Sequence, residues 1–159
     1  MINPDRQGHQ YPPAAPYQVS REAIREFAFS VQAEHPAHHD VDAARALGHR
    51  DLVAPPSFAV IIAQRAEAAV VNDAEAGIDF SRVVHAEERF THHSPILAGD
   101  TLSSQVTLEK IRTMGAGAMV TTVVQISAED GSPRTTVTSS LLVRNDPADS
   151  PARNEKDDA

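Results

Sequence analysis

The sequence contains no cysteine, which excludes disulfide bonds, thiolate nucleophiles, iron–sulfur clusters and cysteine-ligated zinc. No apolar run approaches the ~18 residues that a membrane-spanning helix needs. The formal net charge of -8 argues against a basic surface for nucleic acid or an anionic membrane. The first residues lack the basic start and apolar stretch of a signal peptide. We therefore expect a cytoplasmic protein that binds neither nucleic acid nor membranes.

Length and local composition divide the chain into three expected parts. Residues 1–16 are rich in proline and predict an N-terminal arm. Residues 17–145 are expected to form one domain, since a chain of 159 residues suits a single hydrophobic core. Residues 146–159 contain proline and charged groups but no candidate core residues, a composition that predicts a disordered acidic tail.

The first half of the domain has helical patterns. Ser20 is a suitable N-cap because its hydroxyl can accept a hydrogen bond from a first-turn N–H. Ile24, Phe27 and Val31 then recur at helical spacing and predict an amphipathic helix. A second, short helix is expected over 41–47.

A central helix is predicted over 58–71. Pro55-Pro56 precedes it, and proline is compatible with a helix only in the first turn. The first half of this segment is apolar on every side, which is typical of a helix buried all round. Arg65 and Glu67 predict that only its later turns meet water.

The second half of the chain has a β-pattern, in which apolar and polar residues alternate with a period of two. Four strands are expected, over 82–91, 101–112, 118–128 and 134–144. An apolar helix followed by an antiparallel meander predicts the α+β class. We expect a single hot-dog fold, an antiparallel sheet wrapped around a long central apolar helix. Such a sheet leaves one edge open, so a dimer is expected along it.

Several segments together resemble one family. They are residues 17–28, 40–46, 54–58, 79–85 and 98–100. In combination they are similar to the MaoC-like dehydratase N-terminal (FAS1-like dehydratase) family of actinobacteria, which includes the A and C subunits of the mycobacterial (3R)-hydroxyacyl-ACP dehydratase. The resemblance covers about residues 11–145. It implies a hot-dog fold and an acyl thioester substrate carried by acyl carrier protein (ACP) or coenzyme A (CoA), with no cofactor.

Reversible dehydration of a 3-hydroxyacyl thioester needs a base for the C2 proton, an acid for the departing hydroxide, and hydrogen-bond donors for the enolate-like oxygen. In (R)-specific hydratases of the wider group, an Asp and a His five residues later supply the acid–base pair. The backbone N–H of a glycine at the start of the central helix supplies a donor. Aligning Pro36 with the proline between that Asp and His puts the histidine at His38 and the aspartate position at Ala33. The glycine falls on Pro55.

The catalytic candidate His38 is therefore expected without its carboxylate, and Pro55 has no N–H to donate. Loss of an oxyanion donor typically costs about 10²–10³ in rate, and loss of an acid–base group about 10²–10⁴. The isolated chain is expected to be close to inactive. The alternative, that His38 is simply a polar loop residue, remains open.

Three further residues are candidates for substrate binding: Ser57, Phe58 and His85. For each an ordinary role stays open: Ser57 as a helix cap, Phe58 as core and His85 as a structural hydrogen-bonding residue. No metal site is expected. His92 and His93 are adjacent on a predicted strand, so they point to opposite faces and cannot easily serve one ion.

The leading hypothesis is a subunit of a (3R)-hydroxyacyl-thioester dehydratase or hydratase. This subunit would be non-catalytic alone and would shape the acyl pocket for a catalytic hot-dog partner. Two alternatives stay open, a self-sufficient (R)-specific enoyl hydratase that uses His38 and a non-catalytic homodimer that binds acyl thioesters. A hot-dog thioesterase would need a carboxylate near the central helix, and Glu67 is the candidate on that helix.

Overall fold

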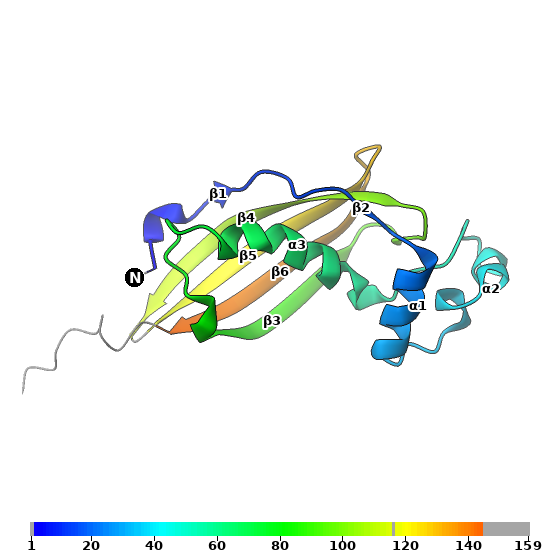
Figure 1. Cartoon of the computed structure of the whole chain (residues 1–159), viewed down its shortest axis with the longest axis horizontal. Coiled ribbons are helices and arrows are strands. Elements are labelled where there is room, and N and C mark those ends of the chain that lie inside the picture. Colours follow the sequence, from blue (N-terminus) through cyan, green and yellow to red (C-terminus); the bar gives the residue numbers. More distant parts are fainter. Residues whose placement is uncertain (1, 116, 145–159) are drawn as a thin grey trace, which may run out of the picture.

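The computed structural model describes residues 2–115 and 117–144, and the predicted tail over 146–159 lies outside this range. In the described part, six strands form one antiparallel sheet with a helix across one face (Figure 1). The strands are β1 (His9–Gln10), β2 (Tyr17–Gln18), β3 (Val83–His92), β4 (Thr101–Met114), β5 (Gly117–Ala128) and β6 (Pro133–Arg144). The α-helices are α1 (Arg21–Ser30), α2 (Val41–Ala46) and α3 (Ala59–Val71). Short 3-10 turns are η1 (Pro4–Arg6), η2 (Pro36–His38), η3 (Pro56–Phe58) and η4 (Phe80–Arg82).

The sheet has the order β1-β4-β5-β6-β3, and β2 also pairs with β4. Bulges interrupt the pairing of β3 with β6 between His85 and Glu87, and of β4 with β5 between Leu108 and Lys110. A bulge bends the strand that carries it and increases the local twist. The sheet accordingly curves around α3, which is the expected hot-dog arrangement (Figure 1).

The expected strands are confirmed, with boundaries within two residues of those observed. Their period of two is visible in the burial: Val106, Val120 and Val124 are fully buried and belong to the core cluster. The N-cap of α1 is confirmed as well, because the Ser20 hydroxyl accepts from the Ala23 N–H at 3.0 Å. Local patterns therefore predicted the regular elements of the domain.

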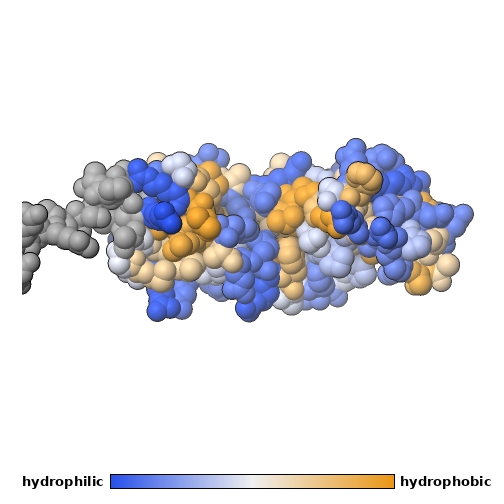
Figure 2. Space-filling model, turned by 90° about the horizontal axis from the view of Figure 1, so that it is seen from below, coloured by the Kyte–Doolittle hydropathy of each residue, from blue (hydrophilic) through white to orange (hydrophobic). Residues whose placement is uncertain are grey.

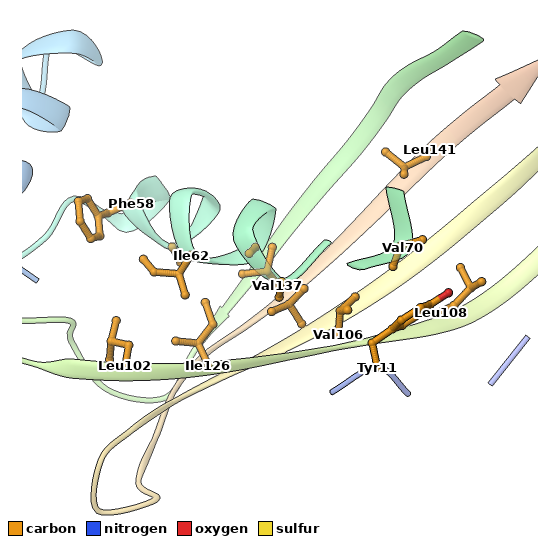
Figure 3. Packing of buried hydrophobic residues seen from close by; sticks show 14 of the residues in the cluster. Tyr11, Phe58, Ile62, Val70, Leu102, Val106, Leu108, Ile126, Val137 and Leu141 are labelled. Atoms are coloured by element: carbon orange, nitrogen blue, oxygen red, sulfur yellow. The ribbon is translucent and has the colours of Figure 1, made fainter. Parts of the chain in front are cut away.

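The helix α3 packs its apolar side on the sheet. Phe58, Ile62 and Val70 pack in one cluster with Val106 and Val137 (Figure 3). α3 begins one residue after the start predicted for the central helix and ends at the predicted residue, and the turn η3 directly precedes it. Among the described residues, no helix is long and apolar enough to cross a membrane.

One expectation for α3 is corrected and another is refined. Val60 and Ile61, in its first half, are only partly buried, because this single chain leaves one side of the helix uncovered. The later turns meet water as expected, with Arg65 and Ala68 exposed, and Glu67 is half-buried. Its Oε1 accepts hydrogen bonds from Thr122 at 2.6 Å and from Ser139 at 2.8 Å. Both hydroxyls lie on the buried face of the sheet.

The N-terminal arm is attached to the sheet and to the end of α3. β1 pairs with β4, and Tyr11 is buried. Asp73, just after α3, accepts from the Tyr11 hydroxyl at 2.7 Å and from Arg6 Nε at 2.9 Å. The Tyr11 hydrogen bond, followed by Arg6, lowers the pKa of Asp73 to about 2. Burial and the hydrogen bond to Asp73 raise the pKa of Tyr11 to about 12.

Candidate functional site

His38 ends the short turn η2, just before α2. Its Nδ1 lies 2.7 Å from the carbonyl oxygen of Val53. A carbonyl oxygen can only accept, so Nδ1 carries a proton, and in the neutral ring Nε2 is the nitrogen with the lone pair. The turn itself is capped by His35, whose Nδ1 accepts from the Ala37 N–H at 3.2 Å. This tautomer could act as a proton acceptor at Nε2.

An ion pair fixes the strand segment that carries Val53. Arg21 on α1 donates to both carboxylate oxygens of Asp51, at 2.9 and 2.7 Å. Asp51 also accepts from the Leu52 N–H at 2.8 Å. The bond from Arg21 is the main reason that the pKa of Asp51 is lowered to about 2. Val53 in turn pairs with Leu97 across an isolated antiparallel bridge. The carbonyl group that bonds to His38 is therefore held in place both by this bridge and by the Arg21–Asp51 ion pair.

The position expected for a catalytic carboxylate, Ala33, is engaged by another histidine. His39 Nε2 donates to the Ala33 carbonyl oxygen at 2.8 Å, and Arg25 Nε donates to the His39 carbonyl at 3.0 Å. Over residues 2–115 and 117–144, no carboxylate forms an ion pair with His38. Within the part of the chain that the structure describes, His38 therefore has a backbone carbonyl as its bonding partner and no paired carboxylate.

The start of the central helix offers little to an oxyanion. Pro55 and Pro56 have no N–H, and the Phe58 N–H is used in the turn, where it donates to the Pro55 carbonyl at 2.9 Å. Ser57 lies inside η3, and neither η3 nor α3 has a side-chain cap at its start. The interpretation of Ser57 as a helix cap was therefore wrong, because the prolines place it one residue inside the first turn.

Phe58 is fully buried, with its ring 5.4 Å from that of Phe27 and 6.4 Å from that of Tyr17. Both pairs have edge-to-face geometry, which aromatic rings prefer. This placement favours the core role of Phe58 over direct contact with a substrate.

A cavity of about 310 Å³ lies at the start of α3. Its lining includes Val53, Pro55, Pro56, His92, His93 and Ile96. His92 ends β3 and contacts Thr135 on the neighbouring strand, with Nδ1 3.2 Å from Oγ1, and its ring stacks with Phe90. The cavity thus combines apolar walls, a titratable ring and the segment that holds His38.

The sequence did not lead us to expect His92 in the lining of this cavity, because the two adjacent histidines are considered above only as metal ligands. The period of two along β3 was a usable signal, since it puts His92 on the same face as Phe90. His93 bonds instead to Thr136, with Nε2 3.0 Å from Oγ1. Within the described residues, no three His, Asp or Glu side chains gather as a metal site would require.

His85 lies near the other end of β3 and is not brought together with His38. Its Nε2 is 2.8 Å from Glu88 Oε2. The N–H is not aligned for a hydrogen bond to that oxygen, so the contact is an ion pair only when His85 is protonated. His85 and Glu67 line a second cavity, of about 380 Å³.

The motif Ala98-Gly99-Asp100 holds the loop next to the Val53 bridge. Asp100, 5% exposed, accepts from the Leu97 N–H at 2.9 Å and from Arg134 Nε at 3.3 Å, and it pairs with Arg50. Gly99 has φ +87°, a left-handed conformation that glycine adopts without strain. The motif therefore has a structural role in positioning the site.

Comparisons with known proteins identify the family of this chain. Residues 6–137 match the model of the FAS1-like, dehydratase domain region. A UPF0336 protein of Leifsonia xyli subsp. xyli is 46% identical, over 91% of this chain and 97% of its own. A solved MaoC-like dehydratase has 33% identity and a TM-score of 0.81, over 88% of this chain, which spans 42% of that chain.

A C-terminally truncated HadBC (3R-hydroxyacyl-ACP dehydratase) complex from Mycobacterium tuberculosis has 31% identity and a TM-score of 0.78. The match covers 87% of this chain and 97% of that one. Since the family model spans most of the sequence and the fold agrees, the chain belongs to the FAS1-like dehydratase family, with the hot-dog fold of the MaoC-like dehydratases.

Proposed function

We propose that this chain is one subunit of a (3R)-hydroxyacyl-thioester dehydratase or hydratase whose chemistry is performed by a second hot-dog chain. The observation that carries the proposal is the incomplete site. His38 is bound to a backbone carbonyl, no carboxylate of the described residues pairs with it, and Pro55-Pro56 precedes the central helix. One histidine can exchange one proton. The reaction needs a base, an acid and an oxyanion donor together.

The open edge of the sheet supports a partner. β3 is the last strand in the sheet order, and none of its ten residues is buried. A long free edge offers unpaired N–H and C=O groups that another strand can satisfy. Figure 2 shows the side that lies lowest in Figure 1, where β3 runs, and apolar surface gathers there in two separate areas divided by a hydrophilic band.

The relatives support a heteromeric assembly in particular. The HadBC neighbour is a complex of a (3R)-hydroxyacyl-ACP dehydratase. In the assembly proposed here, the partner supplies the Asp–His pair and the backbone donor. This chain supplies half of the interface and part of the acyl pocket. The substrate is an acyl thioester on ACP or CoA.

The test compares the purified chain with a complex co-expressed with a MaoC-like chain from a neighbouring gene. The chain alone should leave crotonyl-CoA unchanged, whereas the complex should hydrate it at ordinary enzymatic rates, about 1–10³ s⁻¹. His38→Ala in this chain should leave the rate of the complex within about threefold, because the partner performs the proton transfers. Substitution of the partner's histidine should abolish the rate.

Two results would replace this proposal. Hydration by the chain alone, abolished by His38→Ala, would establish a self-sufficient hydratase, an alternative that His92 on the cavity wall favours. An inactive homodimer that retains an acyl ligand and forms no complex would instead indicate a binding module.

A further inference from the structure

A polar cluster lies between α3 and the sheet, away from His38. Glu67, in the middle of α3, bonds to the hydroxyls of Thr122 and Ser139, which are 1% and 0% exposed. A charged side chain that reaches from a helix onto the buried face of a sheet needs such partners. Both hydroxyls donate to the same oxygen, Oε1.

The cluster extends to the edge strand. Glu88 faces inward opposite Ser139, and its buried Oε2 has no aligned hydrogen-bond donor among the described residues. Burial raises the pKa of Glu88, and the negative charge of Glu67 adds to the effect. The charge of Glu67 therefore acts on Glu88 inside the fold. The proposed chemistry uses neither.

The second cavity, of about 380 Å³, borders this cluster. Its apolar lining includes Val70, Phe80, Val83 and Leu141, and its polar lining includes Glu67 and His85. Val70 and Leu141 are labelled near the C-terminal end of α3 in Figure 3. An apolar ligand chain could fill the first part of the cavity, but a longer one would meet the carboxyl group.

The position of this cavity links it to a partner's site. It lies at the N-terminal end of β3, beside His85, whereas the cavity at the start of α3 lies at the C-terminal end, beside His92. When two related chains pair antiparallel along this strand, the N-terminal end of one strand meets the C-terminal end of the other. The second cavity of this chain then lies next to the catalytic cavity of the partner.

We propose that Glu67 is a specificity-determining residue that limits the length of the alkyl chain accepted by the partner's catalytic site. The inference rests on the proposed function. A short acyl chain packs against Val83 and Phe80 and stops before Glu67. A longer chain pushes methylene groups against the carboxyl group and strips it of water, a cost that discriminates against long substrates.

The test measures kcat/KM of the complex for crotonyl-, octenoyl- and dodecenoyl-CoA. With Glu67→Leu, the ratio of octenoyl-CoA to crotonyl-CoA should rise at least about tenfold. Glu26→Leu, an exposed change on α1, is the matched control and should leave the ratio unchanged. Crotonyl-CoA activity itself reports that each variant complex is folded.

An unchanged ratio in an active Glu67→Leu complex overturns the proposal and leaves the proposed function intact. If the Glu67→Leu complex loses crotonyl-CoA activity, the same ratio is measured with Glu67→Gln. This variant should keep the fold, because its amide oxygen still accepts hydrogen bonds from both hydroxyls. The ratio should then rise severalfold, and no rise overturns the proposal. A wild-type complex that converts none of the three substrates refutes the proposed function together with this inference.

Discussion

Individual carboxylates have different tasks in this molecule. Asp51 and Asp100 each accept several hydrogen bonds. They fix the two segments that pair through Val53 and Leu97. Glu88 is the opposite case, a partly buried carboxyl group with one oxygen lacking an aligned donor. Saturated groups fix the backbone around a site, whereas an unsatisfied buried group costs stability.

Glu88→Gln should stabilise the protein at neutral and higher pH. The pKa of Glu88 is raised in the folded state, so its contribution is lost as the pH rises above the ordinary glutamate value. The variant removes this cost and places an amide beside His85, a gain of about 1 kcal/mol. Thermal unfolding at pH 5 and pH 8 checks it, and the gain in Tm should be larger at pH 8.

Glu109→Gln, at an exposed position on β4, serves as the control for this change. Its Tm should stay that of the wild type at both pH values. A Glu88→Gln protein that is less stable than the wild type at pH 8 would contradict the assignment.

At the scale of elements, the sequence predicted the features that depend on residues close together in the chain. The strands and α1 follow from periodicity and from the Ser20 cap, which involve neighbours in the chain. The environments of Glu67 and His92 depend on hydroxyls of β5 and β6 that lie far along the sequence. A charged residue on a helix predicts a water-facing turn until its distant partners are known.

The candidate site divides in the same way. The positions of His38 and Pro55 followed from a motif, and the structure adds the carbonyl that fixes the His38 tautomer. The engagement of Ala33 by His39 could not be predicted, because it depends on the conformation of a loop.

The arm is joined to α3 by a small hydrogen-bonded group, so Tyr11→Phe should loosen it. The change removes the hydroxyl that bonds to Asp73 and should cost about 1–2 kcal/mol of unfolding free energy. Tyr17→Phe is the control, because the Tyr17 contacts are made through its ring. Urea unfolding measures the stability, and limited proteolysis should cut the arm of Tyr11→Phe first.

The hydrogen-bonded pair of Tyr11 and Asp73 makes the stability of the fold depend on pH at both extremes. The lowered pKa of Asp73 stabilises the fold above the ordinary aspartate value, and this contribution is lost as the pH falls toward about 2. The raised pKa of Tyr11 stabilises the fold below the ordinary tyrosine value, and this contribution is lost as the pH rises toward about 12. Wild type and Tyr11→Phe should therefore converge in stability at both extremes.

At the scale of the whole molecule, the free edge of β3 should become protected when a partner binds. Hydrogen exchange of amides over 83–92 should slow by at least about tenfold in the complex, since unpaired N–H groups gain acceptors. β5, paired on both sides, serves as the internal control and should change little. If only β4 became protected, the partner would bind at the opposite side of the sheet, and the proposed pairing along β3 would be wrong.

The pairing of β1 and β2 with β4 has a consequence for assembly size. These short strands and the segment between them lie along the outer side of β4, while the opposite margin of the sheet stays open (Figure 1). A sheet with two free margins could add chains at both ends and grow into a fibre. Since its own N-terminal segment occupies one margin, the assembly proposed above would join each molecule to one neighbour through this sheet, and growth would stop at a pair.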